Sequence, residues 1–434
     1  MVRKEKSVKK VKAITLGCKV NAYETEYILS CFKNKGFEIN TEEADIYIIN
    51  TCSVTNTSDA KSRKVINRIV RENPNAIIVV MGCMIEAHRD YLNDGVSIII
   101  GNKDKSRVVE LVEEYIENQE QKKLLYDDFD SSFEDMFIED MQEHTRAYVK
   151  IQDGCENFCS YCIIPYTRGK QRSKNPLKVI EEINTLVNNG YKEVVLTGIH
   201  TGHYGSDLNT TFPDLLKRIA KIKGLKRLRI SSIEVTELDD DFLDVLKNEK
   251  VIVNHMHIPL QAGSDTILKL MNRKYLTDYF LDKINIIRSI RPDISITTDI
   301  IVGFPGETEE LFLETLEFAR LINFSKIHVF PFSVRHGTKA ESMPLQIAEQ
   351  VKKDRVKRLV ALSNELEQNY LKSFIGKIVE VLVETNDSNV SIGHTDNYLK
   401  VRVLGKFPSN SFIKVKINNL DNLVLEGSLY EESK

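Results

Sequence analysis

The chain has 434 residues, of which 42% are hydrophobic and 28% charged, and its formal net charge is -3. This is an ordinary globular composition for about two to three domains, and it excludes a protein that binds nucleic acid through a strong overall positive charge. No apolar stretch approaches the ~20 residues of a membrane span, and the basic N-terminus lacks the apolar core of a signal peptide. We therefore expect a cytoplasmic protein whose function depends on local motifs.

Residues 11–116 alternate short apolar runs with helical patterns, which is typical of a parallel sheet with crossover helices. The pattern predicts an α/β domain with a doubly wound parallel sheet. Helices are expected over 23–35 and 59–72. The predicted strands are residues 12–16, 46–49, 77–81 and 96–100.

Three of these predicted strands are each followed at once by a cysteine: Cys18, Cys52 and Cys83. In an open parallel sheet the carboxyl ends of neighbouring strands form one edge, and ligands bind at that edge. We therefore expect the three thiols to converge as an iron-sulfur site. Cys31 falls within a predicted helix and is expected to be an inert packed thiol.

Residues 117–144 contain ten Asp or Glu and only two Lys. This charge bias and the lack of periodicity predict an acidic linker. From residue 145 to 373 the chain again alternates strand, loop and helix, and six strand units predict a partial β/α barrel, since a full one needs eight. The predicted strands are residues 147–151, 193–196, 227–230, 255–258, 294–301 and 327–330, with a closing helix over 345–373.

A second cysteine set follows the first barrel strand, with Cys155, Cys159 and Cys162 in a CxxxCxxC run. Three thiolates in one tight loop can hold three irons of a 4Fe-4S cluster, whereas a purely electron-carrying cluster normally has four cysteine ligands. The fourth iron would be open to a substrate. Zinc bound with His144 as fourth ligand, or unliganded buried thiols, are the alternatives.

The tail, residues 374–434, changes character. Its short alternating runs lie between turns rich in Asn, Asp, Gly and Ser, which predicts a small all-β barrel. Acidic and basic residues nearly balance there. Local basic patches, such as Arg3, Lys4 and Lys6 or the run from Lys217 to Arg229, are more often solvated faces than nucleic-acid sites.

Four segments around these cysteines and near the end of the central domain are distinctive: Thr15–Asn21 with Tyr23–Glu26, Asn50–Asn56, Ile151–Cys155 and Pro331–Thr338. With these motifs the chain closely resembles the methylthiotransferases, radical S-adenosylmethionine enzymes with an N-terminal cluster domain, a radical core and a C-terminal TRAM domain. The resemblance covers nearly the full length and is closest to the branch that acts on N6-threonylcarbamoyladenosine at position 37 of tRNA.

The resemblance implies two 4Fe-4S clusters and S-adenosylmethionine as cofactors. Cys155, Cys159 and Cys162 would hold the cluster that binds S-adenosylmethionine, and Cys18, Cys52 and Cys83 the cluster that carries sulfur for insertion at adenine C2. The tRNA anticodon loop and a low-potential electron donor are the implied partners, with no membrane partner, and the sulfur donor is left open. The sister branches act on isopentenyladenosine in tRNA or on a ribosomal-protein aspartate.

Candidate contacts to S-adenosylmethionine are implied by position alone. Tyr161 would stack near the cofactor adenine or shield the cluster. The other candidates are Thr197, Gly198, Ser232, Glu234, Gln261 and Asp299, each of which could instead satisfy a turn. His200, His203 and His257 are expected to be loop or core histidines and not ligands.

A different functional class, a non-catalytic iron-sulfur carrier or an RNA-binding module, is weighed against the enzyme. A carrier needs no open iron, and a pure RNA binder needs no cluster. Two incomplete cysteine sets in one chain therefore favour the enzyme.

Overall fold

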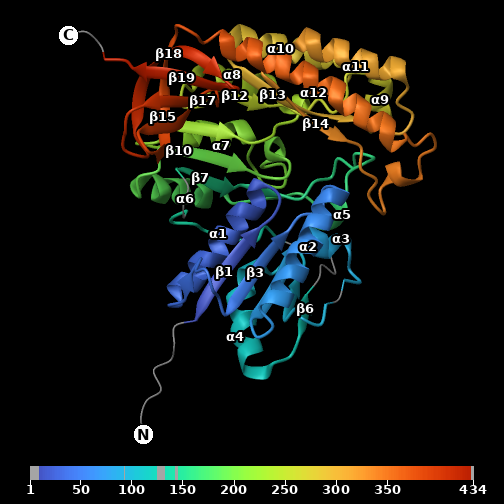
Figure 1. The fold of residues 1–434 in the computed structure, drawn as a ribbon, viewed down its shortest axis with the longest axis vertical. Helices are drawn as coiled ribbons and strands as arrows, with labels where there is room; N and C mark the ends of the chain where they lie inside the picture. The colour runs from blue at the N-terminus through green and yellow to red at the C-terminus, as the bar shows by residue number, and fades with distance from the viewer. Residues whose placement is uncertain (1–8, 92, 125–131, 142–144, 432–434) are drawn as a thin grey trace.

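A computed structural model describes residues 9–91, 93–124, 132–141 and 145–431. Figure 1 shows three parts: an N-terminal sheet domain in blue, a central barrel in green to orange above it, and a red C-terminal barrel against one end of the central strands. None of the helices in the described ranges combines the length and apolar character needed to cross a bilayer. His144, Arg3, Lys4 and Lys6 lie outside the described residues.

The N-terminal domain is built on a six-stranded sheet in the order β2-β1-β3-β4-β5-β6, with every neighbouring pair parallel. The four predicted strands are confirmed, and β2 and β6 are additional. Both are too short and too polar to give an apolar run. The bounds are β1 Lys10–Thr15, β2 Glu38–Ile39, β3 Ile46–Thr51, β4 Ile77–Gly82, β5 Ile98–Ile100 and β6 Lys122–Leu124.

Helices cover both faces of this sheet, as a doubly wound fold requires. Phe32 of α1 packs with Leu111 of α4 on one face, and Ile66 of α2 packs on the other. The strand order reverses direction at β1, so the carboxyl edge between β1 and β3 is the topological switch point where such folds bind ligands. The helices are α1 Lys19–Asn34, α2 Asn56–Glu72, α3 Cys83–Ala87 and α4 Val108–Asn118.

The acidic segment 117–144 contributes to both neighbouring domains in the part that the structure describes. Lys122–Leu124 is the outer strand β6 of the N-terminal sheet. Met136, Ile138 and Met141 are buried in the core of the central domain. The connection therefore packs against the two domains that it joins.

The central domain has the predicted six parallel barrel strands, which confirms the partial barrel. They form two sheets, β11-β10-β7 and β12-β13-β14. Isolated parallel bridges at Leu228–Ile252 and Ser232–His257 join the sheets, and no strand closes the far side within the described ranges. The strands are β7 Arg146–Lys150, β10 Glu193–Thr197, β11 Arg227–Ile230, β12 His255–His257, β13 Ser295–Val302 and β14 Lys326–Pro331.

Helices surround the outer face of the barrel and one long helix packs against β14. That closing helix begins at Glu349 instead of residue 345, because Leu345 adopts a left-handed φ of 60° directly after Pro344. The elements are α5 Ile164–Arg168, α6 Pro176–Asn188, α7 Phe212–Ile219, α8 Asp240–Asn248, α9 Asp265–Leu270, α10 Thr277–Ile290, α11 Glu309–Ile322 and α12 Glu349–Lys372, with the short pair β8 Gln152–Asp153 and β9 Arg172–Ser173.

The C-terminal domain is a closed five-stranded barrel in the order β15-β16-β17-β19-β18, as the tail pattern predicts. Arg227 of β11 donates hydrogen bonds to the backbone oxygens of His394 and Glu380, each at 2.9 Å, and fixes this barrel against the central domain. The end of the basic run 217–229 is therefore a buried domain contact and not a solvated face. The strands are β15 Ile378–Asp387, β16 Val390–Thr395, β17 Lys400–Leu404, β18 Phe412–Asp421 and β19 Val424–Leu429.

Candidate active site

Cys18, Cys52 and Cys83 lie at the carboxyl edge of the N-terminal sheet. Cys18 is the N-cap of α1, Cys52 follows β3 directly, and Cys83 opens α3 after β4. The first two turns touch, because a β-carbon built on Gly17 would lie 2.7 Å from Cys52 Cβ. Gly17 also has a φ of +107°, which glycine alone adopts readily. The sheet thus brings together the three thiols that the strand pattern singled out.

The thiols of this set influence one another's ionisation. Burial raises the pKa of Cys18, and burial together with the neighbouring Cys83 raises the pKa of Cys52 to about 11. All seven cysteines of the chain are free. A metal that binds here would displace protons from the thiols, which is the usual cost of thiolate ligation. Three close, unbridged thiols fit an iron-sulfur cluster.

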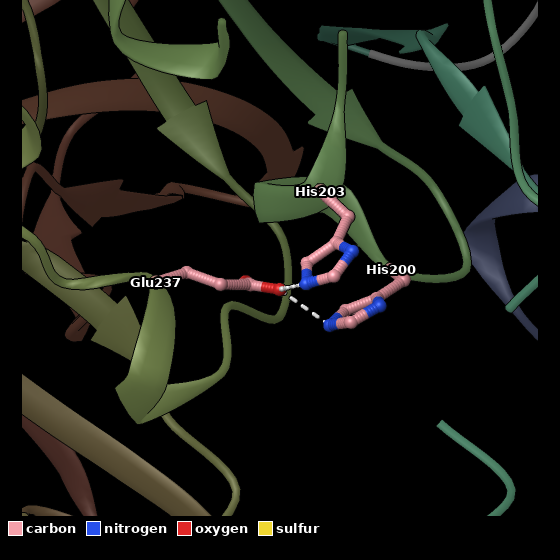
Figure 2. A group of neighbouring side chains, drawn as sticks. All are labelled: His200, His203 and Glu237. Atoms are coloured by element: carbon pink, nitrogen blue, oxygen red, sulfur yellow. Dashed lines mark ion pairs between the residues drawn. The ribbon is translucent and has the colours of Figure 1, made fainter. Parts of the chain in front are cut away.

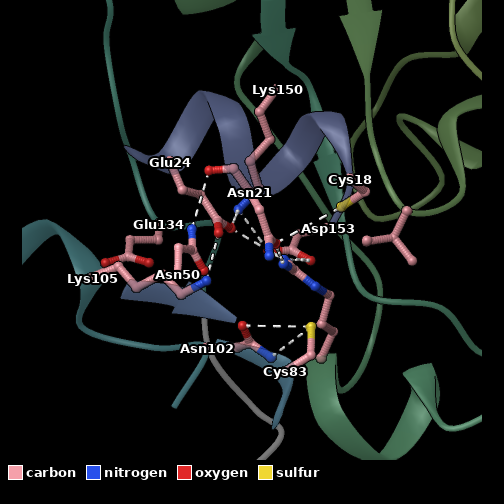
Figure 3. A network of polar contacts seen from close by, with 12 residues as sticks. Cys18, Asn21, Glu24, Asn50, Cys83, Asn102, Lys105, Glu134, Lys150 and Asp153 are labelled. Atoms are coloured by element: carbon pink, nitrogen blue, oxygen red, sulfur yellow. Dashed lines mark hydrogen bonds and ion pairs between the residues drawn. The ribbon is translucent and has the colours of Figure 1, made fainter. Parts of the chain in front are cut away.

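Asn21 holds the first two cysteine turns together (Figure 3). Its Nδ2 donates to the backbone oxygens of Leu16 at 2.8 Å and Thr51 at 3.0 Å. Its Oδ1 accepts a hydrogen bond from Arg168 at 2.9 Å and lies 3.8 Å from Cys18 Sγ. The asparagine of the Thr15–Asn21 motif is therefore a positioning residue for this cysteine set.

Arg168 connects the two cysteine sets. It lies on α5, just after the second set, and its fully buried guanidinium contacts Glu24 of α1 at 3.1 Å and Asp153 at 3.0 Å. Lys150 bridges the same two carboxylates at 2.8 and 2.7 Å. The Nε of Arg168 is buried without a hydrogen-bond partner among the described residues. This cation beside Cys18 and Cys83 suits the negative charge of ligated thiolates.

Cys155, Cys159 and Cys162 share one loop between β8 and α5. The loop turns tightly: Cys162 N donates to Cys159 O at 2.9 Å. A β-carbon on Gly154 would come within 2.0 Å of Lys170 O, so only glycine fits before Cys155. Burial, with Cys159 nearby, raises the pKa of Cys162 to about 12. This donor set also fits a cluster.

Arg273 supplies a cation to this loop. Its Nη1 lies 3.2 Å from Cys159 Sγ, and its Nη2 forms an ion pair with Glu234. Glu234 is predicted from the sequence as a cofactor contact, whereas Arg273 carries no motif that would single it out; it follows the short helix α9. In this structure Glu234 orients Arg273 toward the thiol.

His200, the residue just before the short helix η2 (Thr201–His203), contacts the Cys155–Cys162 loop. Its Nδ1 is 3.8 Å from Cys155 Sγ, and its other nitrogen forms an ion pair with Glu237. Figure 2 shows His203 alongside, stacked on His200 with ring centroids 4.0 Å apart. Burial lowers the pKa of His200, but the contacts with Cys155 and Glu237 outweigh it and raise that pKa to about 10.

A small cavity of about 190 Å³, the Tyr161 cavity, is lined by residues next to both cysteine sets. Tyr161 comes from the Cys155–Cys162 loop, and Val54 and Thr55 follow Cys52 in the chain. Gln261 and Asp299 line it as well. Three of the seven predicted cofactor contacts are therefore brought together in one cavity.

The other four predicted contacts are placed elsewhere. Thr197 is buried at the end of β10, and a β-carbon on Gly198 would meet the side chain of Gln152 at 3.0 Å. Gln152 Oε1 accepts from the backbone N–H groups of Ile199 at 3.0 Å and His200 at 2.7 Å, which holds this turn. Ser232 is exposed. Glu234 is engaged by Arg273, as described above.

The radical SAM superfamily matches residues 149–319, and the family described as Uncharacterized protein family UPF0004 matches residues 10–101. The chain is 44% identical over 423 residues to the threonylcarbamoyladenosine tRNA methylthiotransferase MtaB of Bacillus subtilis, covering 93% of this chain and 92% of that one. The chain belongs to the radical SAM tRNA methylthiotransferases. It is also 37% identical to the tRNA-2-methylthio-N(6)-dimethylallyladenosine synthase of Pelotomaculum thermopropionicum, covering 87% of each chain.

The fold of this methylthiotransferase also resembles a solved structure. The radical S-adenosylmethionine methyltransferase TsrM of Kitasatospora setae, with cobalamin and a [4Fe-4S] cluster bound, superposes with a TM-score of 0.57 at 12% identity, covering 77% of each chain. That likeness concerns the fold alone. As a methylthiotransferase of the radical SAM superfamily, this protein uses S-adenosylmethionine and two 4Fe-4S clusters.

The methylthiotransferase motif Pro331–Thr338 has a structural task. Arg335 lies beyond β14 and reaches the N-terminal domain, where it donates to Ser53 Oγ at 2.6 Å and Asp59 at 2.7 Å. Ser53 directly follows Cys52. Arg335 therefore ties the turn after Cys52 to the central barrel, through a contact between residues far apart in the sequence.

Proposed function

We propose that this protein methylthiolates C2 of N6-threonylcarbamoyladenosine at position 37 of tRNA, giving 2-methylthio-N6-threonylcarbamoyladenosine. The observation that carries the proposal is the Tyr161 cavity, which is lined both by Tyr161 of the Cys155–Cys162 loop and by Val54 and Thr55, which follow Cys52. A cavity lined from both cysteine turns suits a reaction that needs both a radical and a sulfur atom at the same carbon. The relatives named for threonylcarbamoyladenosine support the choice of nucleoside.

In this proposal Cys155, Cys159 and Cys162 hold the cluster that binds S-adenosylmethionine, and Cys18, Cys52 and Cys83 hold the cluster that carries sulfur. When bound, these cofactors supply the radical, the sulfur and the methyl group. The protein's own residues align and enclose the reactants. Tyr161, Gln261 and Asp299 would contact the bound nucleoside and cofactor in the small cavity.

Charged side chains around the cysteines would balance the negative charge of the ligated thiolates. Arg273 does so at Cys159, and Arg168 lies beside Cys18 and Cys83. His200 would donate from Nδ1 to Cys155, with Glu237 orienting the ring. Hydrogen bonds to cluster sulfurs and nearby cations are established means of setting a cluster's reduction potential.

We also propose a cytoplasmic location and a low-potential electron donor as partner. Thiols that bind iron persist in a reducing compartment, and all seven cysteines are free. We also keep as proposed cofactor contacts four residues outside the Tyr161 cavity: Thr197, Gly198, Ser232 and Glu234. In this structure Gly198 lies against Gln152, and Glu234 pairs with Arg273.

The decisive experiment is nucleoside mass spectrometry of tRNA from a strain that lacks this protein. We expect the methylthio product to disappear and its unthiolated precursor to accumulate. Loss of methylthio-isopentenyladenosine instead would move the protein to the sister branch, and an altered ribosomal protein with unchanged tRNA would remove it from RNA modification. Failure of the loaded protein to cleave S-adenosylmethionine to 5'-deoxyadenosine would favour a non-catalytic carrier or RNA binder.

A further inference from the structure

A second cavity, of about 410 Å³, lies where the central barrel, the C-terminal barrel and the start of α1 meet. We call it the Lys19 cavity. Its volume falls within the range of small-molecule sites, about 300–1,000 Å³. All three domains contribute to its wall, including Lys19, His255, His257, His328, Tyr398 and Lys400.

Lys19 brings an uncompensated positive charge to this cavity. Two other cations near it are paired: Lys326 contacts Glu367 at 3.0 Å, and Arg229 contacts Glu193 at 2.8 Å. Lys400, a second lysine of the wall, forms no ion pair with the described carboxylates. No carboxylate of the described residues forms an ion pair with Lys19. A cation that faces other cations in a concave site gains most from an incoming anion.

The rest of the wall suits a nucleoside. Tyr398 presents an aromatic ring stacked on His394 at 4.9 Å, and the Arg229 guanidinium lies 4.7 Å from the Tyr398 ring centroid. Aromatic and arginine planes of this kind are the usual platforms for unstacked bases of single-stranded RNA. His255 adds a buried Nδ1 without a partner among the described residues. The cavity thus offers polar partners as well as stacking surfaces.

The Lys19 cavity adjoins the reaction centre. His257, which lines it, pairs with Asp299, which lines the Tyr161 cavity, at 3.3 Å. Lys19 itself follows Cys18 directly in the chain. A nucleoside whose reacting carbon lies between the cysteine sets could therefore extend a long substituent past the His257–Asp299 pair toward Lys19.

We propose that the Lys19 cavity receives the N6 substituent of the modified adenosine and that the Lys19 ammonium pairs with its carboxylate. This inference rests on the proposed function, because threonylcarbamoyl is the substituent that carries a carboxylate. An isopentenyl group has no charge and would leave the ammonium unpaired, which a site built for polar partners penalises strongly. An RNA phosphate is the other anion that could occupy the site.

The test compares anticodon stem-loops that carry threonylcarbamoyladenosine or plain adenosine at the same position, bound to the full-length, cluster-loaded protein without oxygen. We expect Lys19→Met to weaken binding of the threonylcarbamoyl stem-loop by about 10-fold to 100-fold and to leave the adenosine stem-loop unchanged. Lys19→Arg should keep the preference. Lys33→Met, which changes an exposed lysine at the other end of α1, is the matched control and should alter neither affinity.

A second arm needs no variant and therefore stands even if Lys19→Met loses iron or fails to fold. Replacing the carboxylate of the stem-loop by its neutral amide should weaken binding to the unsubstituted protein by the same factor, and Lys19→Met should add no further loss with the amide. If Lys19→Met weakens binding of the threonylcarbamoyl and the adenosine stem-loops equally, Lys19 contacts a phosphate and the carboxylate pairing is overturned. If it weakens binding of neither, the pairing is overturned as well.

These outcomes separate this inference from the proposed function. If the unsubstituted protein methylthiolates the threonylcarbamoyl stem-loop while the amide binds as tightly as the acid, only the Lys19 pairing is wrong. If it does not act on that stem-loop at all, the proposed function fails and the inference fails with it.

Discussion

The two cysteine sets are built in opposite ways. Cys155, Cys159 and Cys162 lie in one loop, so their spacing in the sequence already places them together. Cys18, Cys52 and Cys83 lie at the ends of three different strands and meet only because β1, β3 and β4 are neighbours in the sheet. The loop set, Cys155, Cys159 and Cys162, depends on the conformation of a few residues, whereas the sheet-edge set, Cys18, Cys52 and Cys83, depends on the folding of a whole domain.

This difference predicts which substitutions would disturb each cysteine set. The loop set is shaped by local features such as Gly154, where a β-carbon would meet Lys170 O. The sheet-edge set is shaped by long-range contacts: Asn21 joins the β1 and β3 turns, and Arg335 reaches Ser53 from the central barrel. Substitutions far from the sheet-edge set in sequence should therefore disturb it, whereas the loop set should resist distant substitutions.

The largest expected effect comes from removing either set. Replacing Cys155, Cys159 and Cys162 with Ala should remove about half of the roughly eight irons and abolish cleavage of S-adenosylmethionine. The same change at Cys18, Cys52 and Cys83 should also remove about half the iron, yet keep cleavage and lose sulfur insertion. Iron analysis and 5'-deoxyadenosine formation measure both. Complete loss of iron in either variant would show that the sets are not independent.

Arg168→Met tests the link between the sets. It leaves the buried carboxylates of Glu24 and Asp153 without one of their cations, and breaking a buried pair in this way costs about 3–5 kcal/mol. We expect a lower free energy of unfolding in denaturant titrations and weaker retention of iron by the sheet-edge set. Arg320→Met is the control, because Arg320 and Glu365 form an exposed ion pair, and such pairs contribute little to stability. Equal effects of the two variants would contradict the role given to Arg168.

Gly17→Ala should act on the sheet-edge set alone. The new methyl group would lie 2.7 Å from Cys52 Cβ, in a backbone with a φ of +107°, so the two turns must move apart. We expect the free energy of unfolding to fall by about 1–3 kcal/mol. The cluster of the sheet-edge set should hold less iron, and cleavage of S-adenosylmethionine should be retained. Gly36→Ala is the matched control, since Gly36 also has a positive φ of +85° but nothing within 4 Å of its added methyl. A drop in cleavage with Gly17→Ala would argue against local action.

Cys31→Ser is expected to have the smallest effect. Cys31 is partly buried in α1 and packs against the core between that helix and the sheet, away from both sets. The variant should keep both clusters and full activity, with a stability change within about 1 kcal/mol. Substantial loss of either cluster would falsify the interpretation of Cys31 as a packing thiol.

Much of the fold follows from periodicity. The six central strands and the five strands of the C-terminal barrel were predicted because each is an apolar or alternating run between turns. β2 and β6 were missed because segments of two or three residues with a single apolar side chain each give no such run. The segment 117–144 was assigned as a linker from its charge, but Met136, Ile138 and Met141 are buried within it, since isolated apolar residues carry no periodic signal.

The residues of the chain are enough to predict the type of metal site. Six of the seven cysteines form two sets of three, and the motifs around them are similar to those of the methylthiotransferases. The charged side chains around those cysteines come from distant segments, so they can be identified only from the tertiary structure. Arg273 and Arg168 lie beside thiols far from them in the chain, and Glu237 pairs with His200, which contacts Cys155. Lys19 and Tyr398 line one cavity only because three domains pack together. Ligand type is encoded in residue identity, whereas charge compensation and cavity shape depend on contacts between distant segments, which no local pattern records.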